Sequence, residues 1–218
     1  MIATILPESA VAVERRDDRE PVTLFAAEEA ALGRAVDGRR AEFSTARGCA
    51  HRALAQLGLP AGPVPAGPRG EPLWPEGAVG SIAHCEGYRA AVVAPAAELL
   101  TVGIDAEPHR PLPEGLLADV SRREERDWLQ ALGVTMPATH WDRLLFCAKE
   151  AVYKAWYPLA ERWLGFEDAT LRVDPRQRSF EAKLLVPGPV VGGAEVTGFR
   201  GRWLVEDGLV LAAIAVQR

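Results

Sequence analysis

The sequence predicts an α+β protein made of two similar halves, each combining helices with a small antiparallel sheet. Amphipathic helical patterns and short apolar runs typical of strands occur both before and after residue 100. Turns at Glu86-Gly87 and Asp207-Gly208 join neighbouring runs as hairpins, which makes those strands antiparallel. We expect an N-terminal subdomain of residues 1–100 and a C-terminal subdomain of residues 101–218, related by a pseudo-twofold axis.

The composition excludes several classes of function. The chain has 218 residues and a net charge of −5, so nothing in it favours attraction to nucleic acid or to an acidic membrane surface. No apolar run approaches the ~20 residues of a membrane span, and the first residues lack the basic segment of a signal peptide. The three cysteines lack metal-ligand spacing and are interpreted as reduced thiols. We therefore expect a cytoplasmic monomer with no nucleic-acid or membrane partner.

The N-terminal half is expected to begin with a strand and to continue with helices and a hairpin. Its elements are a strand at 2–6, a charged loop at 8–20, helices at 21–36 and 39–57, a stiff proline- and glycine-rich loop at 61–75 and a hairpin at 79–95. Asp37-Gly38 separates the two helices, and Gly58 ends the second.

The C-terminal half is expected to contain two helices and a set of strands. Its elements are a strand at 99–105, a helix with a capping box from Ser121 to Glu124, a long helix at 141–156, and strands at 169–173, 180–186, 195–205 and 209–216. Proline or glycine turns separate the strands.

The long helix carries the residues around which the rest of the chain is organised. Glu150 and Lys154 are four residues apart and share one helical face, whereas Lys149 points about 100° away. Such a pair is ordinarily a surface ion pair worth roughly a few tenths of a kcal/mol. The chain has only three lysines, however, and two of them flank Glu150. This choice of lysine in an arginine-rich chain indicates a need for compact ammonium groups.

A pair of carboxylates is predicted where the strand at 99–105 ends. Asp105 and Glu107 are two residues apart, so their side chains project from one face of the strand and those of Ile104 and Ala106 from the other. The plainer interpretation is a strand end that runs into solvent. Together with Glu150, the pair makes three carboxylates without a His or Cys partner, a hard-oxygen set suited to Mg²⁺, with Mn²⁺ as an alternative.

Basic residues from three separate segments form a second candidate site, and they are Arg39, Arg40, Arg47, Arg69 and His84. Taken singly, each fits a solvated surface residue, and His84 fits a core histidine equally well. Arg40 and Arg47 are two helical turns apart and are expected near one face. If folding brings the three segments together, they form a polyphosphate site. The chain has no Walker-type or dinucleotide glycine motif.

Several segments together resemble the motifs of a known enzyme family. GSIAHCEGYRAAVVA, VGIDAEPHRPLP and FCAKEAVYKAWYPL, in this order, are similar to the three motifs of phosphopantetheinyl transferases of the surfactin-synthetase-activator (Sfp) type. The segments RRAEFSTARGCAHRAL, GPRGEPLWPEGAVGS and RWLGFEDA resemble the branch that contains the EntD and PptT proteins. The resemblance covers residues from about 21 to 170.

The resemblance implies the 4'-phosphopantetheinyl transferase fold and an enzyme that moves the phosphopantetheine arm of coenzyme A to a carrier-protein serine, releasing 3',5'-ADP. It implies that Asp105, Glu107 and Glu150 hold Mg²⁺ and that Asp105, Glu150 and Lys154 form the catalytic group. Glu150, directly or through a water, would deprotonate the serine hydroxyl. Lys154 would stabilise charge on the phosphate under attack, and Lys149 would line the phosphates.

The same resemblance assigns the basic cluster to coenzyme A. Arg40, Arg47 and His84, with Arg39 beside them, would bind its phosphates, and Arg69 would lie in the adenine-side loop. Two positions depart from the family pattern. Ala83 replaces a frequent Ser or Thr, so a phosphate-binding hydroxyl is expected to be missing, and Ala106 replaces a polar residue of some members, so water is expected in place of a ligand.

The implied partners are acyl or peptidyl carrier proteins, or carrier domains of fatty-acid, polyketide or nonribosomal-peptide synthases, including those that make siderophores. Carrier proteins of this family's reactions are acidic. We therefore expect a receiving surface at 163–166 together with Arg122 and Arg123.

Two rival functions use the same residues. A Mg²⁺-dependent hydrolase would cleave the coenzyme A pyrophosphate with water and release 3',5'-ADP without a carrier. A non-catalytic coenzyme A-binding module would dock on a synthase and leave the mass of its carrier unchanged.

Overall fold

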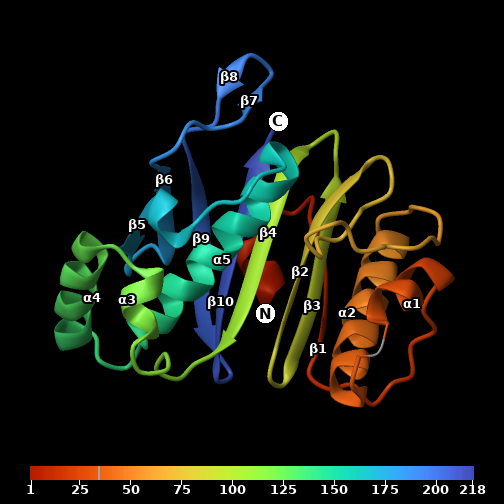
Figure 1. Ribbon diagram of the computed structural model, residues 1–218, viewed down its shortest axis with the longest axis horizontal. Helices are drawn as coiled ribbons and strands as arrows, with labels where there is room; N and C mark the ends of the chain where they lie inside the picture. Colours follow the sequence, from red (N-terminus) through yellow and green to blue (C-terminus); the bar gives the residue numbers. More distant parts are fainter. Residues whose placement is uncertain (34) are drawn as a thin grey trace.

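The computed structural model describes residues 1–33 and 35–218 and contains two antiparallel sheets that lie side by side (Figure 1). The three-stranded sheet has the order β1-β3-β2, with β1 (Val11–Arg15), β2 (Ala78–Cys85) and β3 (Tyr88–Pro95). The five-stranded sheet has the order β4-β10-β9-β6-β5, with β4 (Leu99–Pro108), β5 (Ala169–Asp174), β6 (Ser179–Leu184), β9 (Gly198–Glu206) and β10 (Leu209–Gln217). A small hairpin of β7 (Val190–Val191) and β8 (Ala194–Glu195) projects from one end. The predicted α+β class is confirmed.

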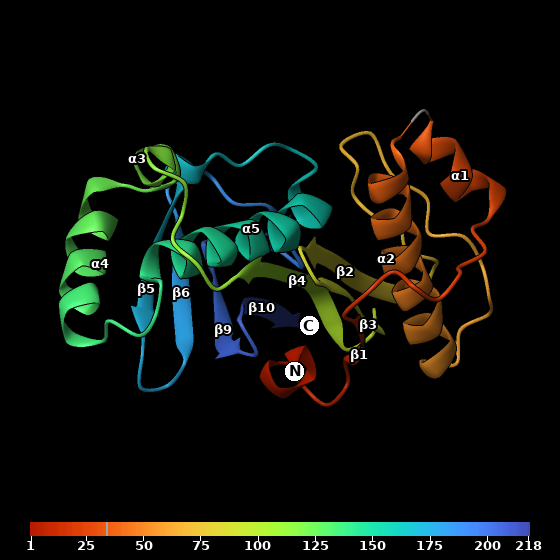
Figure 2. The ribbon, with the colours of Figure 1, turned by 90° about the horizontal axis from the view of Figure 1, so that it is seen from below.

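Each sheet is covered by one helix of 20 residues. The helix α2 (Asp37–Gln56) packs on the three-stranded sheet and α5 (Trp141–Ala160) on the five-stranded sheet; in Figure 2 α5 lies above its sheet and α2 at the right of its own. The shorter helices are α1 (Ala26–Leu32), α3 (Leu116–Val120), α4 (Arg123–Thr135) and the 3-10 turns η1 (Ile2–Ile5) and η2 (Phe166–Asp168). Among the described residues, none of the helices combines the length and apolar character needed to cross a membrane.

The two sheets meet where β4 lies alongside β2. The backbone N–H of Ile104 donates a hydrogen bond to Ser81 Oγ at 3.0 Å. One apolar cluster spans this junction and takes residues from both halves, including Tyr88 and Leu211, and Ile2 of η1 closes it on the side opposite α5. The two halves therefore share part of their core, while the subdomain boundary and the pseudo-twofold relation stay predictions.

Small residues allow α5 to approach β4 unusually closely. A Cβ atom at Gly103 would lie 2.1 Å from the carbonyl oxygen of Ala151 and 2.6 Å from the nitrogen of Ala155. Beside this contact, Thr101 Oγ1 donates a hydrogen bond to the Ala155 carbonyl at 2.9 Å. The absent side chain at Gly103 thus sets the distance between the helix that bears Glu150 and the strand that bears the other two carboxylates.

The beginning of the chain differs from its sequence prediction in two respects. The segment at 2–6 is a 3-10 turn rather than a strand, because Ile2 and Ile5 are three residues apart and both are buried on one side of such a turn. The predicted loop at 8–20 contains β1, which pairs antiparallel with β3. The short run Val11–Arg15 is half-buried throughout, and its flanking charges conceal it in the sequence.

Three helix and strand limits also need correction. The helix predicted from Pro21 begins only at Ala26, where Glu28 Oε2 accepts the N–H of Phe25 at 2.9 Å; residue 34, within the predicted range, lies outside the described residues. In α4 the N–H of Arg122 is accepted by Glu125 at 2.7 Å, so the predicted capping box is displaced by one residue. The strand predicted at 195–205 is divided between β8 and β9.

Replacing Gly103 by alanine is expected to destabilise the protein by about 1–3 kcal/mol, because the new methyl group would force α5 away from β4. Gly133, in α4, has no atom within 4 Å of the equivalent position, and Gly133→Ala is expected to stabilise by about 0.4–1 kcal/mol. Urea denaturation of both variants measures the difference. If Gly103→Ala and Gly133→Ala were equally stable, the absence of a side chain at Gly103 would not limit how closely α5 approaches β4.

Candidate functional site

A cleft of about 410 Å³ lies between the two halves, bordered by α2, the loop before β2, and β2, β4 and α5. Most of the predicted site residues line it, and these are Arg39, Arg47, Arg69, His84, Asp105, Glu107, Glu150 and Lys154. Folding therefore brings together residues from five separate segments. Two predicted members of the site, Arg40 and Lys149, do not line this cleft.

Two of the carboxylates are paired with cations from α5. Asp105 Oδ1 accepts a hydrogen bond from Lys154 Nζ at 2.7 Å. Glu107 Oε2 accepts one from Arg143 Nη1 at 2.8 Å, while Arg143 also donates to the carbonyls of residues 110 and 111. Arg143, Glu150 and Lys154 are seven and four residues apart, so one face of α5 supplies all three groups.

The acidic side of the cleft retains unsatisfied negative charge. Asp105 Oδ2 is buried and has no hydrogen-bond partner among the described residues. Burial, then the neighbouring Asp105 and Glu107, raise the pKa of Glu150 to about 7, although Lys154 acts in the opposite direction. Burial and Asp105 likewise raise the pKa of Glu107. Three carboxylates thus face two cations, which favours the arrival of a further positive charge.

The arrangement falls short of a ready-made metal site. Among the described residues, no three His, Cys, Asp or Glu side chains are grouped so that they would hold a metal ion. Asp105 and Glu107 are instead turned toward Lys154 and Arg143. Burial opposes the charged form of Lys154, but Asp105 and Glu150 outweigh it and raise the pKa of this lysine, so the ammonium is retained.

The basic side of the cleft carries a carboxylate, Glu42, whose Oε2 lies 3.6 Å from Arg39 Nη1 and 4.0 Å from His84 Nδ1. Arg39 Nη1 lies 3.1 Å from His84 Nε2. The guanidinium of Arg47 stacks over the ring of Phe43 at 4.5 Å, and its buried Nε has no partner among the described residues. Burial, with Arg39 adding to it, lowers the pKa of Arg47 to about 10, and burial followed by Arg39 and Lys154 lowers the pKa of His84. An anion placed here would relieve both effects.

Arg40 is the first correction to the predicted site. Its Nη1 forms an ion pair with Glu29 at 2.8 Å on the outside of α2. The face that lines the cleft carries Arg39, Phe43 and Arg47, which are spaced by four residues each. The predicted spacing was therefore one residue out of register, and Arg39 occupies the position expected for Arg40.

Lys149 is the second correction. Its ammonium donates to Glu125 Oε2 at 2.7 Å and to the carbonyls of Phe166 and Ala169 at 2.7 and 3.3 Å, which uses all three of its protons. Burial lowers its pKa, although Glu125 opposes that change. Lys149 therefore joins α5 to α4 and to the segment around Phe166, and it lines the neighbouring smaller cavity rather than the cleft.

A second, smaller cavity of about 90 Å³ lies on the Lys149 side of α5. It is bordered by Trp163, Leu164 and Phe166, and it shares Glu150 and Tyr153 with the main cleft. Beside it, Arg122 Nη1 donates to the carbonyl of Glu167 at 2.8 Å. The two segments expected to receive a carrier protein are thus neighbours, and their role stays a prediction.

The two positions that depart from the family pattern do not face the cleft. Ala83 and Ala106 are fully buried in the apolar cluster between the sheets. The expectations of a missing phosphate-binding hydroxyl at 83 and of a water in place of a ligand at 106 are therefore not supported by the geometry. The alternation of β4, with Asp105 and Glu107 toward the cleft and Ala106 away from it, is as predicted.

Sequence reasoning missed Arg143 and the aromatic lining of the cleft. Phe43, Trp74, Phe146, Tyr153 and Tyr157 all border it. A signal was present for two of them, because Phe43 lies four residues from both Arg39 and Arg47, and Phe146 lies four residues before Glu150. The position of Trp74 depends on the path of the loop and has no such signal.

Comparison with known proteins identifies the family. The model of the 4'-phosphopantetheinyl transferase N-terminal domain matches residues 27–94, and that of the 4'-phosphopantetheinyl transferase superfamily matches residues 101–189. The chain is 55% identical to 4'-phosphopantetheinyl transferase Svp of Streptomyces mobaraensis, covering 99% of this chain and 89% of the relative. It is 48% identical to Npt of Nocardia iowensis (99% of each) and 46% identical to PptT of Mycobacterium tuberculosis (99% and 98%), both also 4'-phosphopantetheinyl transferases.

A more distant likeness supports the predicted branch. Enterobactin synthase component D of Salmonella typhi is 36% identical over 54% of this chain and 48% of its own length. With family models on both halves and relatives that match nearly its whole length, this chain belongs to the 4'-phosphopantetheinyl transferase superfamily, enzymes that transfer phosphopantetheine from coenzyme A to carrier proteins.

Proposed function

We propose that coenzyme A lies across the cleft with its 3'-phosphate on the arginine side and its pyrophosphate beside Lys154. Arg47 supports this orientation, because it is a buried cation whose Nε lacks a partner among the described residues. Arg39 and His84 border the same space, with Arg69 in the loop above it. The pantetheine arm would then extend past Glu150 and Tyr153 toward the small apolar cavity at Trp163.

The carboxylates fit a divalent cation that arrives together with the substrate. Mg²⁺ uses oxygen ligands and is commonly shared between one or two carboxylates and substrate phosphates. Asp105, with its unpartnered Oδ2, and Glu150 would hold such an ion, and Glu107 would do so after release from Arg143. When bound, Mg²⁺ would draw charge from the pyrophosphate. Mn²⁺ offers the same oxygen chemistry.

Glu150 is proposed to accept the proton of the carrier serine, directly or through a water. Its pKa near 7 matches the requirement for a base that works at neutral pH. The serine oxygen would form a bond to the β-phosphorus of coenzyme A as the bond from that phosphorus to the bridging oxygen breaks, and 3',5'-ADP would leave with the negative charge. Lys154 would stabilise this charge, since it stays protonated beside the carboxylates.

One observation carries the proposal. A carboxylate with a raised pKa and a retained ammonium lie on one face of α5, in a cleft whose opposite wall carries Arg39, Arg47 and His84. Such a site provides positioning and electrostatic stabilisation, which phosphoryl transfer chiefly requires.

The two rival functions are separated by simple measurements. Rapid release of 3',5'-ADP without a carrier would indicate the hydrolase. A carrier protein whose intact mass does not change in the presence of coenzyme A and Mg²⁺ would indicate a silent binding module. Transfer instead adds the mass of one phosphopantetheine arm.

We further propose that the enzyme acts in the cytoplasm as a monomer on carrier domains of fatty-acid, polyketide or nonribosomal-peptide synthases, including siderophore synthases. The likeness to an enterobactin synthase component supports the last class. Assaying a panel of excised apo-carrier domains by intact mass identifies the preferred class, and size-exclusion chromatography with light scattering tests the monomer.

Glu150→Gln is expected to lower kcat for transfer by about 10²–10⁴, because the amide keeps the shape of the side chain but cannot accept the serine proton. Intact mass of a carrier protein over time measures the rate. Circular dichroism serves as the control for folding. A rate near that of the wild type would remove Glu150 from the catalytic group.

The raised pKa of Glu150 also predicts how stability depends on pH in a chelating buffer. Between pH 4.5 and about 7 the unfolded chain has released this proton while the folded chain retains it, so folding stability falls as pH rises. The contribution is absent below 4.5 and constant above about 7. Glu150→Gln should therefore gain about 1–2 kcal/mol relative to the wild type at pH 8 and almost nothing at pH 4.5. Urea denaturation at the two pH values measures it, and a pH-independent difference would contradict the assignment.

Arg47→Ala is expected to raise the KM for coenzyme A by about tenfold or more, because it removes a charged hydrogen bond to phosphate. The effect should be much smaller for dephospho-coenzyme A, which lacks the 3'-phosphate. Arg40→Ala is the matched control, since Arg40 pairs with Glu29 outside the cleft. Equal effects of Arg47→Ala on both substrates would show that Arg47 does not contact the 3'-phosphate.

A further inference from the structure

The face of the five-stranded sheet opposite α5 is open along β5, β6 and β9, and we call this surface the rear face. Strand alternation places exposed side chains there, and the turn between β5 and β6 adds others. Its basic members are Arg172, Arg176, Arg178, Lys183, Arg200 and Arg202, and its acidic members are Asp174, Glu181 and Glu206. Six cations against three anions give a local charge of +3, whereas the whole chain carries −5, which leaves −8 elsewhere.

The acidic residues of the rear face are too few to neutralise it. Glu181 pairs with Arg200 at 2.9 Å, but both side chains are largely exposed, at 64% and 86%, so the pair is weak. Asp174 Oδ1 accepts the backbone N–H groups of Arg176 and Gln177 and thereby holds the turn. Arg202 lies opposite Ser179 across the sheet and has no ion pair among the described residues.

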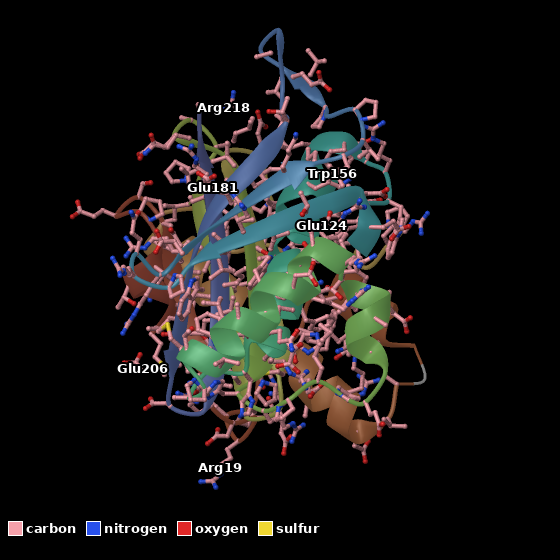
Figure 3. All side chains as sticks on the ribbon, turned by 90° about the vertical axis from the view of Figure 1, so that its left-hand side faces the viewer. Arg19, Glu124, Trp156, Glu181, Glu206 and Arg218 are labelled. Carbon is pink, nitrogen blue, oxygen red and sulfur yellow. The ribbon has the colours of Figure 1, made fainter. Side chains whose placement is uncertain are left out.

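A groove of about 520 Å³ runs along one side of the rear face. Ile5, Leu6 and Pro7 form one wall, the small residues Ala213 and Ala215 lie within it, and Arg200 and Arg202 border it. Figure 2 shows η1 on this side of the sheet, away from α5. In Figure 3, Glu181 lies on one side of the sheet and Glu124, at the start of α4, on the other. The groove combines apolar and polar lining, and Arg200, Arg202 and Glu181 lie at its border. Its apolar part and net positive charge fit an acidic protein segment better than a nucleic-acid backbone.

We propose that the rear face docks an acidic segment of the protein that bears the acceptor serine, at a place outside the carrier fold itself. The proposal rests on the proposed function. A carrier with its serine at Glu150 must lie on the α5 side, and the sheet separates that side from the rear face. A flanking domain or linker of a larger synthase can reach the rear face, and complementary charge would speed its association.

Arg202→Glu tests the proposal with two substrates, an intact carrier-bearing synthase subunit and its excised carrier domain. The variant is expected to raise the KM for the intact subunit about tenfold at low salt, with kcat and the KM for the excised domain unchanged. The difference should shrink at about 0.5 M salt, because the ions screen exposed charges. Arg202 forms no ion pair among the described residues, so the substitution leaves no carboxylate there without its partner.

Two controls accompany this variant. Arg19→Glu changes the net charge equally at a residue whose side chain is 91% exposed and points away from the sheet (Figure 3), and it should alter neither KM. Arg123→Glu, at the predicted carrier-receiving surface, should raise the KM for both substrates. An unchanged KM of Arg202→Glu for the intact subunit, or an equal rise for both substrates, would overturn the proposal.

Direct binding separates this proposal from the proposed function. The intact subunit with its acceptor serine changed to alanine is immobilised, and biolayer interferometry compares the wild type with Arg202→Glu. If the wild type transfers no phosphopantetheine yet binds this subunit about tenfold more tightly than Arg202→Glu does, the proposed function fails and the docking surface stands. If Arg202→Glu binds the subunit as the wild type does but loses a duplex-DNA binding or a self-association that the wild type shows, the rear face belongs to another partner.

Discussion

The close contact between α5 and β4 is the constraint on which the cleft depends. Gly103 removes the side chain that would hold the two apart, and the alanines at 151 and 155 present a flat helical surface to it. Since α5 carries Glu150 and Lys154 while β4 carries Asp105, the same contact sets the spacing of acids and ammonium. Across this contact Lys154 Nζ lies 2.7 Å from Asp105 Oδ1.

The charges of the cleft are segregated, with an excess of carboxylates on the β4 side and an excess of basic groups on the α2 side. On the β4 side carboxylates outnumber their cations. On the α2 side Arg39 and His84 share Glu42, and Arg47 forms no ion pair among the described residues. Both conditions oppose folding in the absence of ligand, since buried charge without a partner is costly. A substrate with several phosphates and a divalent cation would satisfy both sides at once. Before such a substrate binds, the cation–π contact with the ring of Phe43 holds the guanidinium of Arg47 in place.

Periodicity predicted the part of the site that depends on a single element. The two-residue repeat of β4 placed Asp105 and Glu107 together, and the four-residue repeat of α5 placed Glu150 with Lys154. The sequence failed where the answer depends on packing between elements. Arg39 rather than Arg40 faces the cleft because the packing of α2 against β3 decides which helical face is turned inward. Lys149 forms its ion pair with Glu125, a residue of another helix. The strand β1 was missed because five half-buried residues give too short a pattern.

The two sheets differ in size because the strands of the larger sheet beyond β4 support α5 instead of lining the cleft. The cleft uses only β4 of the five-stranded sheet, and its neighbours β10, β9, β6 and β5 extend away from it. On the inner face these strands supply Leu171, Phe180 and Trp203 to the apolar cluster on which α5 packs, so they support this helix. Alternation then obliges every second residue to project from the other face. That face needed only to be polar, and equal numbers of both signs would have sufficed; its excess of positive charge is therefore a feature that the packing of α5 does not explain.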